Sequence, residues 1–238
     1  MKFAFVDYRI SDKELTSLKK INIEPIKVPP CHKLYNAING HVDIQLFQSS
    51  PLCNQFIAYK DIPENFLSKL TSLKVNFTLS SSSLGETYPE NIALNCISTG
   101  SILIHNLKYT DEQIKTLCKN KKLINIKQGY SKCSCAIVNN SAFITSDIGI
   151  YNVLKSCSYD VLLLPAGDIV LEDFDYGFIG GTCGLISKDT MAFFGDINQY
   201  KYGDQVKEFL DSHNVNIISL NDGKLVDRGG LFIFDSSI

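Results

Sequence analysis

A repeated order of apolar and polar segments is the feature of this chain that most constrains its fold. Five short apolar segments each end in an aspartate or asparagine, at Asp7, Asp61, Asn106, Asp147 and Asp196. Successive ends lie 41 to 54 residues apart in the 238-residue chain. A period of this length is typical of proteins built from one supersecondary unit that cannot bury its apolar face alone. The spacing therefore predicts several copies of one structural module.

Each apolar segment is followed by a stretch with helical periodicity and then by a segment of β-type composition. The predicted helices cover residues 11–20, 62–73, 110–120, 148–157 and 202–213. The β-type segments after them cover residues 21–28, 74–79, 122–127, 159–165 and 215–220. Ser11, and Thr110 with Gln113 three positions later, have the residue types and spacing of helix N-caps.

A further predicted strand leads into the apolar segment of the next module. These leading strands cover residues 41–47, 90–97, 133–138, 181–186 and 228–234. The last of them has no strand, helix and strand after it, and the segment 1–7 has no leading strand before it. Joined, the two ends complete a fifth module, which predicts a single domain, 1–238, closed into a ring by pairing of its N- and C-terminal strands. An open α/β sandwich with coincidental spacing is the alternative.

Composition argues against several classes of partner. The net charge is −2, and arginine occurs only at Arg9 and Arg228, so there is no electrostatic case for binding nucleic acid or an anionic membrane. No apolar stretch approaches the roughly 18 residues of a membrane helix. The N-terminal segment 1–10 is too short and too charged for a signal peptide, and the eight cysteines show neither CxxC nor zinc spacing. We therefore expect a cytoplasmic protein with reduced thiols, no cofactor and no metal site.

A ring of five strand–strand–helix–strand modules resembles the pentein β/α-propeller. That superfamily includes arginine deiminases, amidinotransferases and dimethylarginine hydrolases, which modify guanidines. The segment His41-Val-Asp43 is similar to the His-x-Asp/Glu element of those enzymes, and Asp227-Arg-Gly-Gly230 is similar to the Gly-rich turn before their last inner strand. The motifs QGYSKC, YGFIGG and LVDRGG together are most similar to an uncharacterised bacterial family of pentein-like proteins. The resemblance implies a central cavity, lined where the inner strands begin, that takes a small molecule.

The catalytic cysteine of the resembling enzymes follows the last Gly-rich turn, whereas residues 229–238 of this chain contain no cysteine. The candidate nucleophile is instead Cys133, which stands at the start of a predicted leading strand beside Lys132. A neighbouring cation favours the thiolate, although a buried core thiol is the alternative. Cys135 lies two residues further on the same strand face, deeper in the apolar segment, and we interpret it as core.

His41 and Asp43 are the candidate acid–base pair. Two residues apart in a strand, they would share a face, where the carboxylate can orient the imidazole. A solvated turn histidine is the alternative. The candidate substrate-binding residues are Glu90, Asn91, Lys132, Asp175 and Arg228. The two acidic residues suit a cationic or guanidino group or else lie in solvent, and Arg228 suits a substrate carboxylate or pairs with a carboxylate of the chain.

The leading hypothesis is therefore a hydrolase or transferase that acts on an amidine, guanidino or related C–N bond through the Cys133 thiolate. A non-catalytic propeller that binds a small molecule or serves as an interaction scaffold is the alternative, and the missing cysteine after Gly230 favours it. Metal-dependent hydrolysis is a third hypothesis that lacks a ligand set in the sequence. The sequence indicates neither the substrate nor the oligomeric state.

Overall fold

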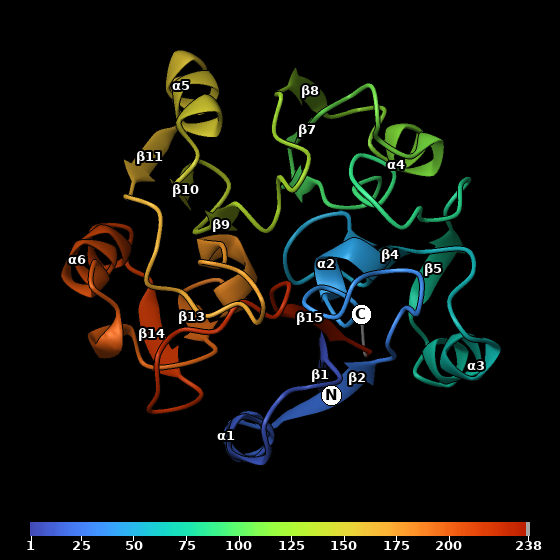
Figure 1. Cartoon of the computed structure of the whole chain (residues 1–238), viewed down its shortest axis with the longest axis horizontal. Helices are drawn as coiled ribbons and strands as arrows, with labels where there is room; N and C mark the ends of the chain where they lie inside the picture. The colour runs from blue at the N-terminus through green and yellow to red at the C-terminus, as the bar shows by residue number, and fades with distance from the viewer. Residues whose placement is uncertain (237–238) are drawn as a thin grey trace.

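The computed structural model describes residues 1–236 and arranges them in a ring of modules (Figure 1). The strands of this part of the chain form five three-stranded sheets. In each sheet the middle strand pairs antiparallel with the leading strand and parallel with the third strand. The leading, middle and third strands are, around the ring, β15 (Phe232–Asp235), β1 (Lys2–Asp7) and β2 (Ile23–Val28); β3 (Leu46–Gln48), β4 (Gln55–Ala58) and β5 (Asn76–Leu79); β6 (Ile97–Ser98), β7 (Ile102–His105) and β8 (Lys122–Asn125); β9 (Cys135–Ile137), β10 (Ala142–Thr145) and β11 (Asp160–Leu163); β12 (Cys183–Ser187), β13 (Thr190–Phe193) and β14 (Asn216–Ser219).

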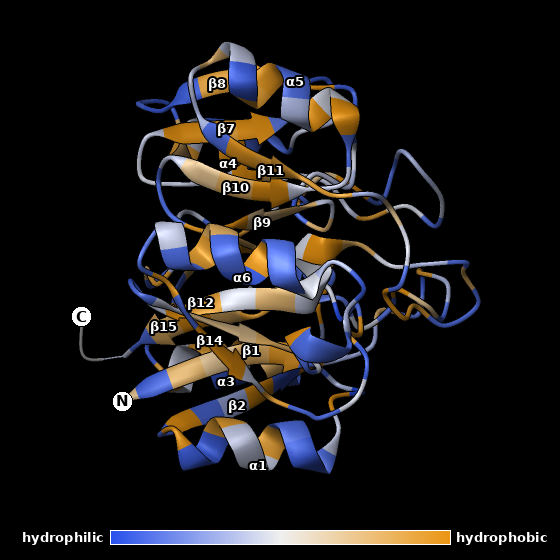
Figure 2. Ribbon diagram, turned by 90° about the vertical axis from the view of Figure 1, so that its left-hand side faces the viewer, coloured by the Kyte–Doolittle hydropathy of each residue, from blue (hydrophilic) through white to orange (hydrophobic). Residues whose placement is uncertain are grey.

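One helix connects the middle strand of each module to its third strand and lies at the outer rim of the ring (Figure 1). These helices are α1 (Asp12–Lys20), α3 (Glu64–Ser72), α4 (Glu112–Leu117), α5 (Ile148–Ser156) and α6 (Gly203–Ser212). Polar and apolar residues alternate along them, while the strands beneath are largely apolar (Figure 2). Leu18, Leu70 and Leu210 are buried side chains that anchor three of the helices to the sheets. The predicted order of strand, strand, helix and strand is confirmed in every module.

The helix N-termini follow the sequence signals with one correction. Ser11 caps α1 in a capping box, because its side chain accepts from the N–H of Glu14 while Glu14 accepts from the N–H of Ser11. At α4 the cap is Asp111, which accepts from the N–H of Gln113 at 2.9 Å. The predicted cap Thr110 instead places its hydroxyl 2.8 Å from the ring of His105, a buried histidine. None of the helices in residues 1–236 has the length and apolar composition needed to cross a membrane.

The two ends of the chain close the ring, as the sequence predicts. β15 pairs antiparallel with β1 over four residue pairs, from Lys2 opposite Asp235 to Phe5 opposite Phe232. The rings of Phe3 and Phe5 stack on Phe234 with centroids 5.3 and 5.0 Å apart. Burial of these aromatic faces adds to the strand pairing and makes the closing sheet part of the apolar core.

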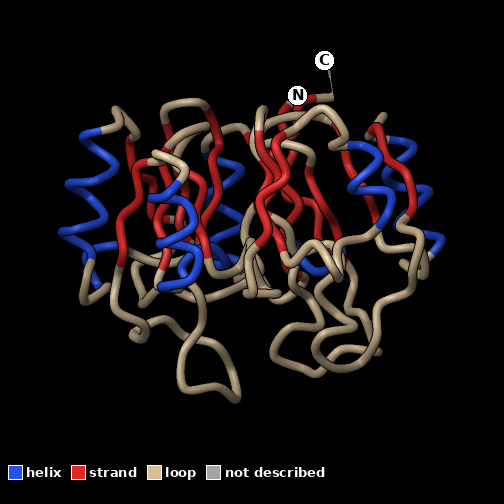
Figure 3. Tube along the Cα trace, turned by 90° about the horizontal axis from the view of Figure 1, so that it is seen from above, coloured by secondary structure: helices blue, strands red, loops and turns tan. Residues whose placement is uncertain are grey.

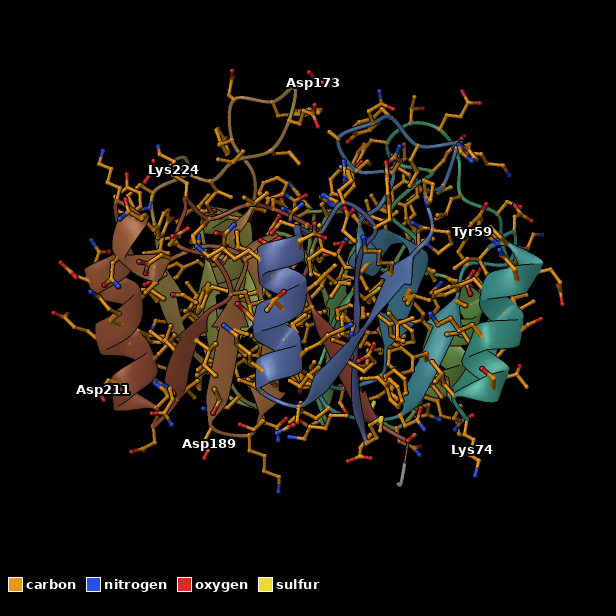
Figure 4. All side chains as sticks on the ribbon, turned by 90° about the horizontal axis from the view of Figure 1, so that it is seen from below. Tyr59, Lys74, Asp173, Asp189, Asp211 and Lys224 are labelled. Atoms are coloured by element: carbon orange, nitrogen blue, oxygen red, sulfur yellow. The ribbon has the colours of Figure 1, made fainter. Side chains whose placement is uncertain are left out.

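The leading strands are shorter than predicted. Residues 42–45, expected to be strand, form the short helix α2 (Val42–Gln45), and residues 179–182 form the 3₁₀ helix η1 (Ile179–Thr182). A second 3₁₀ helix, η2 (Ile197–Gln199), lies in the outer part of the last module. The long connections that enter the leading strands project from one face of the ring, opposite the chain termini (Figure 3). Asp173 marks the tip of one such connection, on the face away from Asp189 and Lys74 (Figure 4).

A buried ion pair links the C-terminal and N-terminal parts of the module that closes the ring. The Nη2 of Arg228 lies 3.1 Å from Oε2 of Glu14 on α1, and the Glu14 side chain is fully buried. We expect Glu14→Ala to lower the free energy of unfolding by about 3 kcal/mol, because the guanidinium then lacks its buried partner. Urea unfolding measures the change.

Two variants on the same helix separate the ion pair from other effects. Lys13→Ala removes an exposed pair with Asp222 and should change stability by less than about 1 kcal/mol. Ser11→Ala removes the cap and the hydrogen bond from the Ser11 hydroxyl to Glu14 but leaves the pair of Glu14 with Arg228, and should lower stability by about 1 kcal/mol. Equal effects of Glu14→Ala and Ser11→Ala would show that the contact with Arg228 does not stabilise ring closure.

Candidate active site at the centre of the ring

A cavity of about 170 Å³ lies where connections from several modules meet. Its innermost polar residues are His41, Cys133 and Asp227, each no more than 3% exposed. Its outer lining is aromatic, with Tyr35 and Phe174 among the side chains that reach solvent. The residues come from the turn before α2, the turn before β9, the connection from β11 to η1 and the turn before β15, so the cavity exists only in the closed ring.

The thiol of Cys133 points at the carboxylate of Asp43. Its Sγ lies 3.1 and 3.0 Å from the two carboxylate oxygens, so the protonated thiol donates to Asp43. Burial and the charges of Asp43 and Asp227 raise the pKa of Cys133 well above the usual value for a thiol. In the unliganded protein Cys133 is therefore a neutral thiol.

Asn95 holds the thiol and the carboxylate together. Its Oδ1 accepts from the backbone N–H groups of Lys132 and Cys133 at 2.8 and 3.2 Å. Its Nδ2 donates to the Cys133 sulfur and to the backbone carbonyl of Asp43, each at 3.3 Å. The sequence interpretation missed Asn95, although a buried amide inside the apolar segment 92–97 is the kind of signal that could have identified it.

Asp43 is fully buried on α2. Burial raises its pKa to about 6, against the opposing effects of Lys132 and His41. The carboxylate therefore exchanges a proton close to neutral pH, which suits a group that accepts a proton from a thiol. Expected beside the imidazole of His41, Asp43 is instead hydrogen-bonded to Cys133.

The carboxylate nearest to His41 is that of Asp227, whose Oδ1 lies 3.8 Å from Nε2. Within residues 1–236, neither ring nitrogen of His41 has a hydrogen-bond partner. Asp227 is fixed by the N–H groups of Phe178 and Gly229, at 2.8 and 3.0 Å. Gly229 has φ +68°, and a Cβ there would overlap the His41 side chain, so this turn requires glycine. The imidazole is thus buried with both nitrogens available to a ligand.

The sequence suggests that the cation of Lys132 favours the thiolate of Cys133, but the structure places that cation elsewhere. Its ammonium donates to the carbonyl of Gly180 at 2.9 Å and lies over the Phe232 ring, and Lys132 is not among the residues that line the cavity. Its charge lowers the pKa of Asp43, while the residues that shift the pKa of Cys133 are mainly acidic. The argument for a thiolate stabilised by Lys132 was therefore wrong, and the role left to Lys132 is to hold a buried positive charge near Asp43. Cys135 is fully buried in the apolar core, as predicted.

None of the five predicted substrate-binding residues lines the cavity, and three of them have contacts or surroundings elsewhere. Glu90 is exposed in a separate groove beside Lys108, and Asp175 is exposed in a hollow beside Lys224. Arg228 is occupied by Glu14 and by the carbonyl of Arg9. Loop position alone suggested all three, and it does not determine which way a side chain points.

Asn91 contributes to the cavity indirectly. It is fully buried, and its Oδ1 accepts from the hydroxyl of Tyr130 at 2.9 Å. Tyr130 lines the cavity, and its hydroxyl lies 3.4 Å from that of Tyr35. The role of Asn91 is therefore to position an aromatic wall.

The same residues could also hold a metal ion. A nitrogen of His41, a carboxylate oxygen of Asp43 and the sulfur of Cys133 all lie within 4.8 Å of one another. Imidazole, carboxylate and thiolate are the ligand types that Zn²⁺ takes in proteins. The sequence spacing gave no indication of this set, because its members come from different modules.

Comparison with known sequences places the chain in a family. Residues 5–232 match a family described as "Family of unknown function (DUF6873)". The chain belongs to this family. No curated protein matches it significantly.

Solved structures share the fold across most of this chain. DDAH from Pseudomonas aeruginosa, in a mutant complexed with citrulline, has 8% identity and a TM-score of 0.55, covering 92% of this chain and 91% of its own. A Campylobacter jejuni (C. jejuni) agmatine deiminase with bound substrate has 11% identity and a TM-score of 0.54, covering 94% and 90%. An inosamine-phosphate amidinotransferase from Streptomyces griseus has 10% identity and a TM-score of 0.50, covering 92% and 77%. At these identities the similarity shows the fold, which is the five-module pentein propeller.

Because the pKa of Asp43 is raised on folding, its ionisation destabilises the native state. The folded protein holds the proton of Asp43 more tightly than the unfolded chain does. The destabilisation is therefore absent below about pH 4 and complete above about pH 6. A shift of about two units corresponds to about 3 kcal/mol. Asp43→Asn removes this ionisation. We therefore expect the change in the free energy of unfolding caused by Asp43→Asn to be more stabilising at pH 7 than at pH 4 by about that amount, measured by urea unfolding.

Comparing the two pH values cancels the pH-independent effects of the substitution itself. Asp175→Asn, at an exposed aspartate outside the cavity, is the matched control. If Asp43→Asn changed stability equally at both pH values, Asp43 would not be the buried, readily protonated carboxyl described above.

Proposed function

We propose that this protein is a cysteine-dependent enzyme that cleaves a C–N bond of a small amidine or guanidine, by hydrolysis or by transfer to a second amine. The observation that carries the proposal is the convergence of the Cys133 thiol, the His41 imidazole and the carboxylates of Asp43 and Asp227 at one small cavity. A nucleophile, a proton carrier and groups that bind a cation are the parts that such a reaction needs.

The charges at the cavity favour a cationic ligand. Asp227 lines the cavity, and Asp43 lies behind the Cys133 sulfur. Among the described residues that line the cavity, none is a lysine or arginine. A planar amidinium can donate two parallel hydrogen bonds to a carboxylate, an arrangement stronger than bonds between neutral groups. The structures similar in fold include an amidinotransferase, an agmatine deiminase and DDAH, which agrees with a ligand of this class.

The geometry suggests how the thiol becomes reactive. A bound cation near Asp43 and Asp227 offsets the negative charges that raise the pKa of Cys133. The thiol proton passes to Asp43, and Sγ forms a bond to the amidine carbon. The C–N bond then breaks, and the leaving nitrogen takes the proton held by Asp43, relayed through His41. Water adds to the carbon and gives one proton to His41, the C–S bond breaks, and His41 passes that proton to the sulfur, which restores the thiol.

The position of the nucleophile differs from that of the resembling enzymes, but the ring accommodates the difference. The last Gly-rich turn supplies Asp227 rather than a cysteine, while Cys133 comes from the turn before β9. The long loops of the chain project on one face of the ring, opposite the chain termini (Figure 3). Residues from different modules can therefore supply the same group to the cavity.

An affinity-alkylation experiment tests the proposal. Chloroacetamidine carries the proposed cation and an electrophilic carbon, and chloroacetamide is its neutral analogue. We expect chloroacetamidine to modify Cys133 roughly tenfold faster than chloroacetamide does, because opposite charges concentrate the cation at the thiol. Peptide mass spectrometry gives the rates, and the half-buried Cys53 and Cys157 correct for intrinsic reactivity.

Asp227→Asn should remove most of the preference for the cationic reagent while leaving Cys53 and Cys157 unaffected. If the two reagents modify Cys133 at the same corrected rate in the unaltered protein, the proposed enzymatic function is wrong. The non-catalytic propeller then becomes the better interpretation.

A second candidate function is metal-dependent hydrolysis. It is favoured by buried His41, whose ring nitrogens have no hydrogen-bond partner among residues 1–236, next to a carboxylate and a thiol. A zinc site with three protein ligands leaves a fourth position for water, whose pKa the metal lowers to about 7. In this case Cys133 binds the metal and does not attack the substrate.

Cobalt binding distinguishes the two candidates. If the metal function holds, Co²⁺ added to the metal-free protein produces thiolate-to-cobalt absorption at about one ion per chain. His41→Ala and Cys133→Ser should each abolish that absorption, whereas His32→Ala, at an exposed histidine elsewhere, should not. Absence of the absorption in the unaltered protein would reject the metal function.

A further inference from the structure

The size of the cavity limits how much of a ligand can be buried. Its volume is about 170 Å³. An apolar cavity of about 150 Å³ in another protein holds a molecule the size of benzene. Once an amidinium group lies near Asp227, the space left accommodates little more than a small flat group. Anything beyond that group must lie among the side chains at the mouth.

The mouth is lined by a row of aromatic side chains from separate connections. The rings of Tyr35 and Phe174 lie 5.6 Å apart, and the hydroxyl of Tyr35 is 3.4 Å from that of Tyr130. Tyr88 extends the row, with its ring 5.8 Å from that of Tyr130. Phe174 is 52% exposed and Tyr176 is 42% exposed, so these rings are available to a ligand. Grouped exposed aromatic side chains beside a cavity typically mark a binding surface.

The described residues that line the cavity include no lysine or arginine that could bind a ligand carboxylate. Arg9 and Arg228 are the two arginines of the chain, and neither lines the cavity. The guanidinium of Arg9 binds the carboxylate of Asp7, and that of Arg228 pairs with Glu14. The connection that carries Phe174 and Tyr176 adds the exposed acidic side chains of Glu172, Asp173 and Asp175. A ligand carboxylate at the mouth would therefore lose hydration and meet like charge.

We infer that the ligand is a monosubstituted amidine or guanidine whose substituent is a flat apolar group without a carboxylate, such as an aryl ring. The inference rests on the proposed function for the amidinium end of the ligand. The substituent is assigned independently, by the aromatic mouth and by the absence of a lysine or arginine among the described residues that line the cavity. Guanidines that are part of an amino acid are excluded, because their carboxylate has no partner in the described lining of the cavity.

Binding to the Cys133→Ser variant tests the inference without turnover. Isothermal titration calorimetry compares phenylguanidine with 4-guanidinobenzoate, which adds only a carboxylate, with arginine, and with the neutral isostere phenylurea. We expect phenylguanidine to bind roughly tenfold more tightly than each of the other three, since each lacks its charge or adds an unpaired carboxylate.

Variants at the mouth test the aromatic contact. Tyr176→Ala should weaken phenylguanidine binding by roughly fivefold and leave methylguanidine binding unchanged, because the contact with the mouth is made by the phenyl ring, which methylguanidine lacks. Leu123→Ala, at a similarly exposed apolar residue on β8 away from the cavity, is the control and should change neither affinity.

The outcomes separate this inference from the proposed function. If 4-guanidinobenzoate or arginine binds as tightly as phenylguanidine, the substrate class is wrong while the amidinium site stands. If phenylurea binds as tightly as phenylguanidine, the cavity does not select a cation, and the proposed function fails with the inference. If none of the four compounds binds, the proposed function and the inference also fail together.

Discussion

The antiparallel pairing of β15 with β1 is the contact on which the rest of the structure depends. It supplies the first module with its leading strand and so closes the ring. The turn before β15 is then fixed on both sides: the N–H of Asp43 donates to the carbonyl of Gly229 at 3.1 Å, and the N–H of Gly230 donates to that of Gly181 at 2.9 Å. Asp227 reaches the cavity through this turn. Without the pairing the sheets could still form locally, but the site would lose one carboxylate and one wall.

The centre of the ring tolerates buried polar groups that a stability-optimised core would avoid. Asp43 is fully buried with a raised pKa, and His41 has no hydrogen-bond partner for either ring nitrogen in the described structure. Buried groups of this kind are unfavourable for folding, and they gather at functional sites because a ligand can complete their interactions. The apolar clusters around the strands, together with the closing sheet, offset that destabilisation. The apolar strands and the closing sheet therefore hold in place a centre whose buried polar groups lack some of their hydrogen bonds.

Much of the scaffold could be predicted from the sequence, whereas the site was predicted only in part. The five modules and the closure of the ring were inferred correctly, and Cys135 was correctly assigned to the core. The structure also brings His41, Asp43 and Cys133 together. Their expected contacts were wrong, because Asp43 bonds to the thiol rather than the imidazole, and Lys132 turns away to Gly180. Asn95 and Asp227 were not among the predicted site residues.

The sequence by itself determined the strands, the helices and their order, because periodicity, caps and turns act between residues that are near in the chain. It also determined the closure, since each end of the chain carries half of one module. Only the tertiary structure decided which polar side chains meet at the centre. Asp43 and Cys133 are 90 residues apart in the chain, and their contact depends on how neighbouring modules are inclined and on where each leading strand begins. The leading segments begin as a short helix, a 3₁₀ turn or a glycine turn, and each of these points its polar side chains differently. No local periodicity specifies those directions, because they follow from the packing of five sheets around one axis.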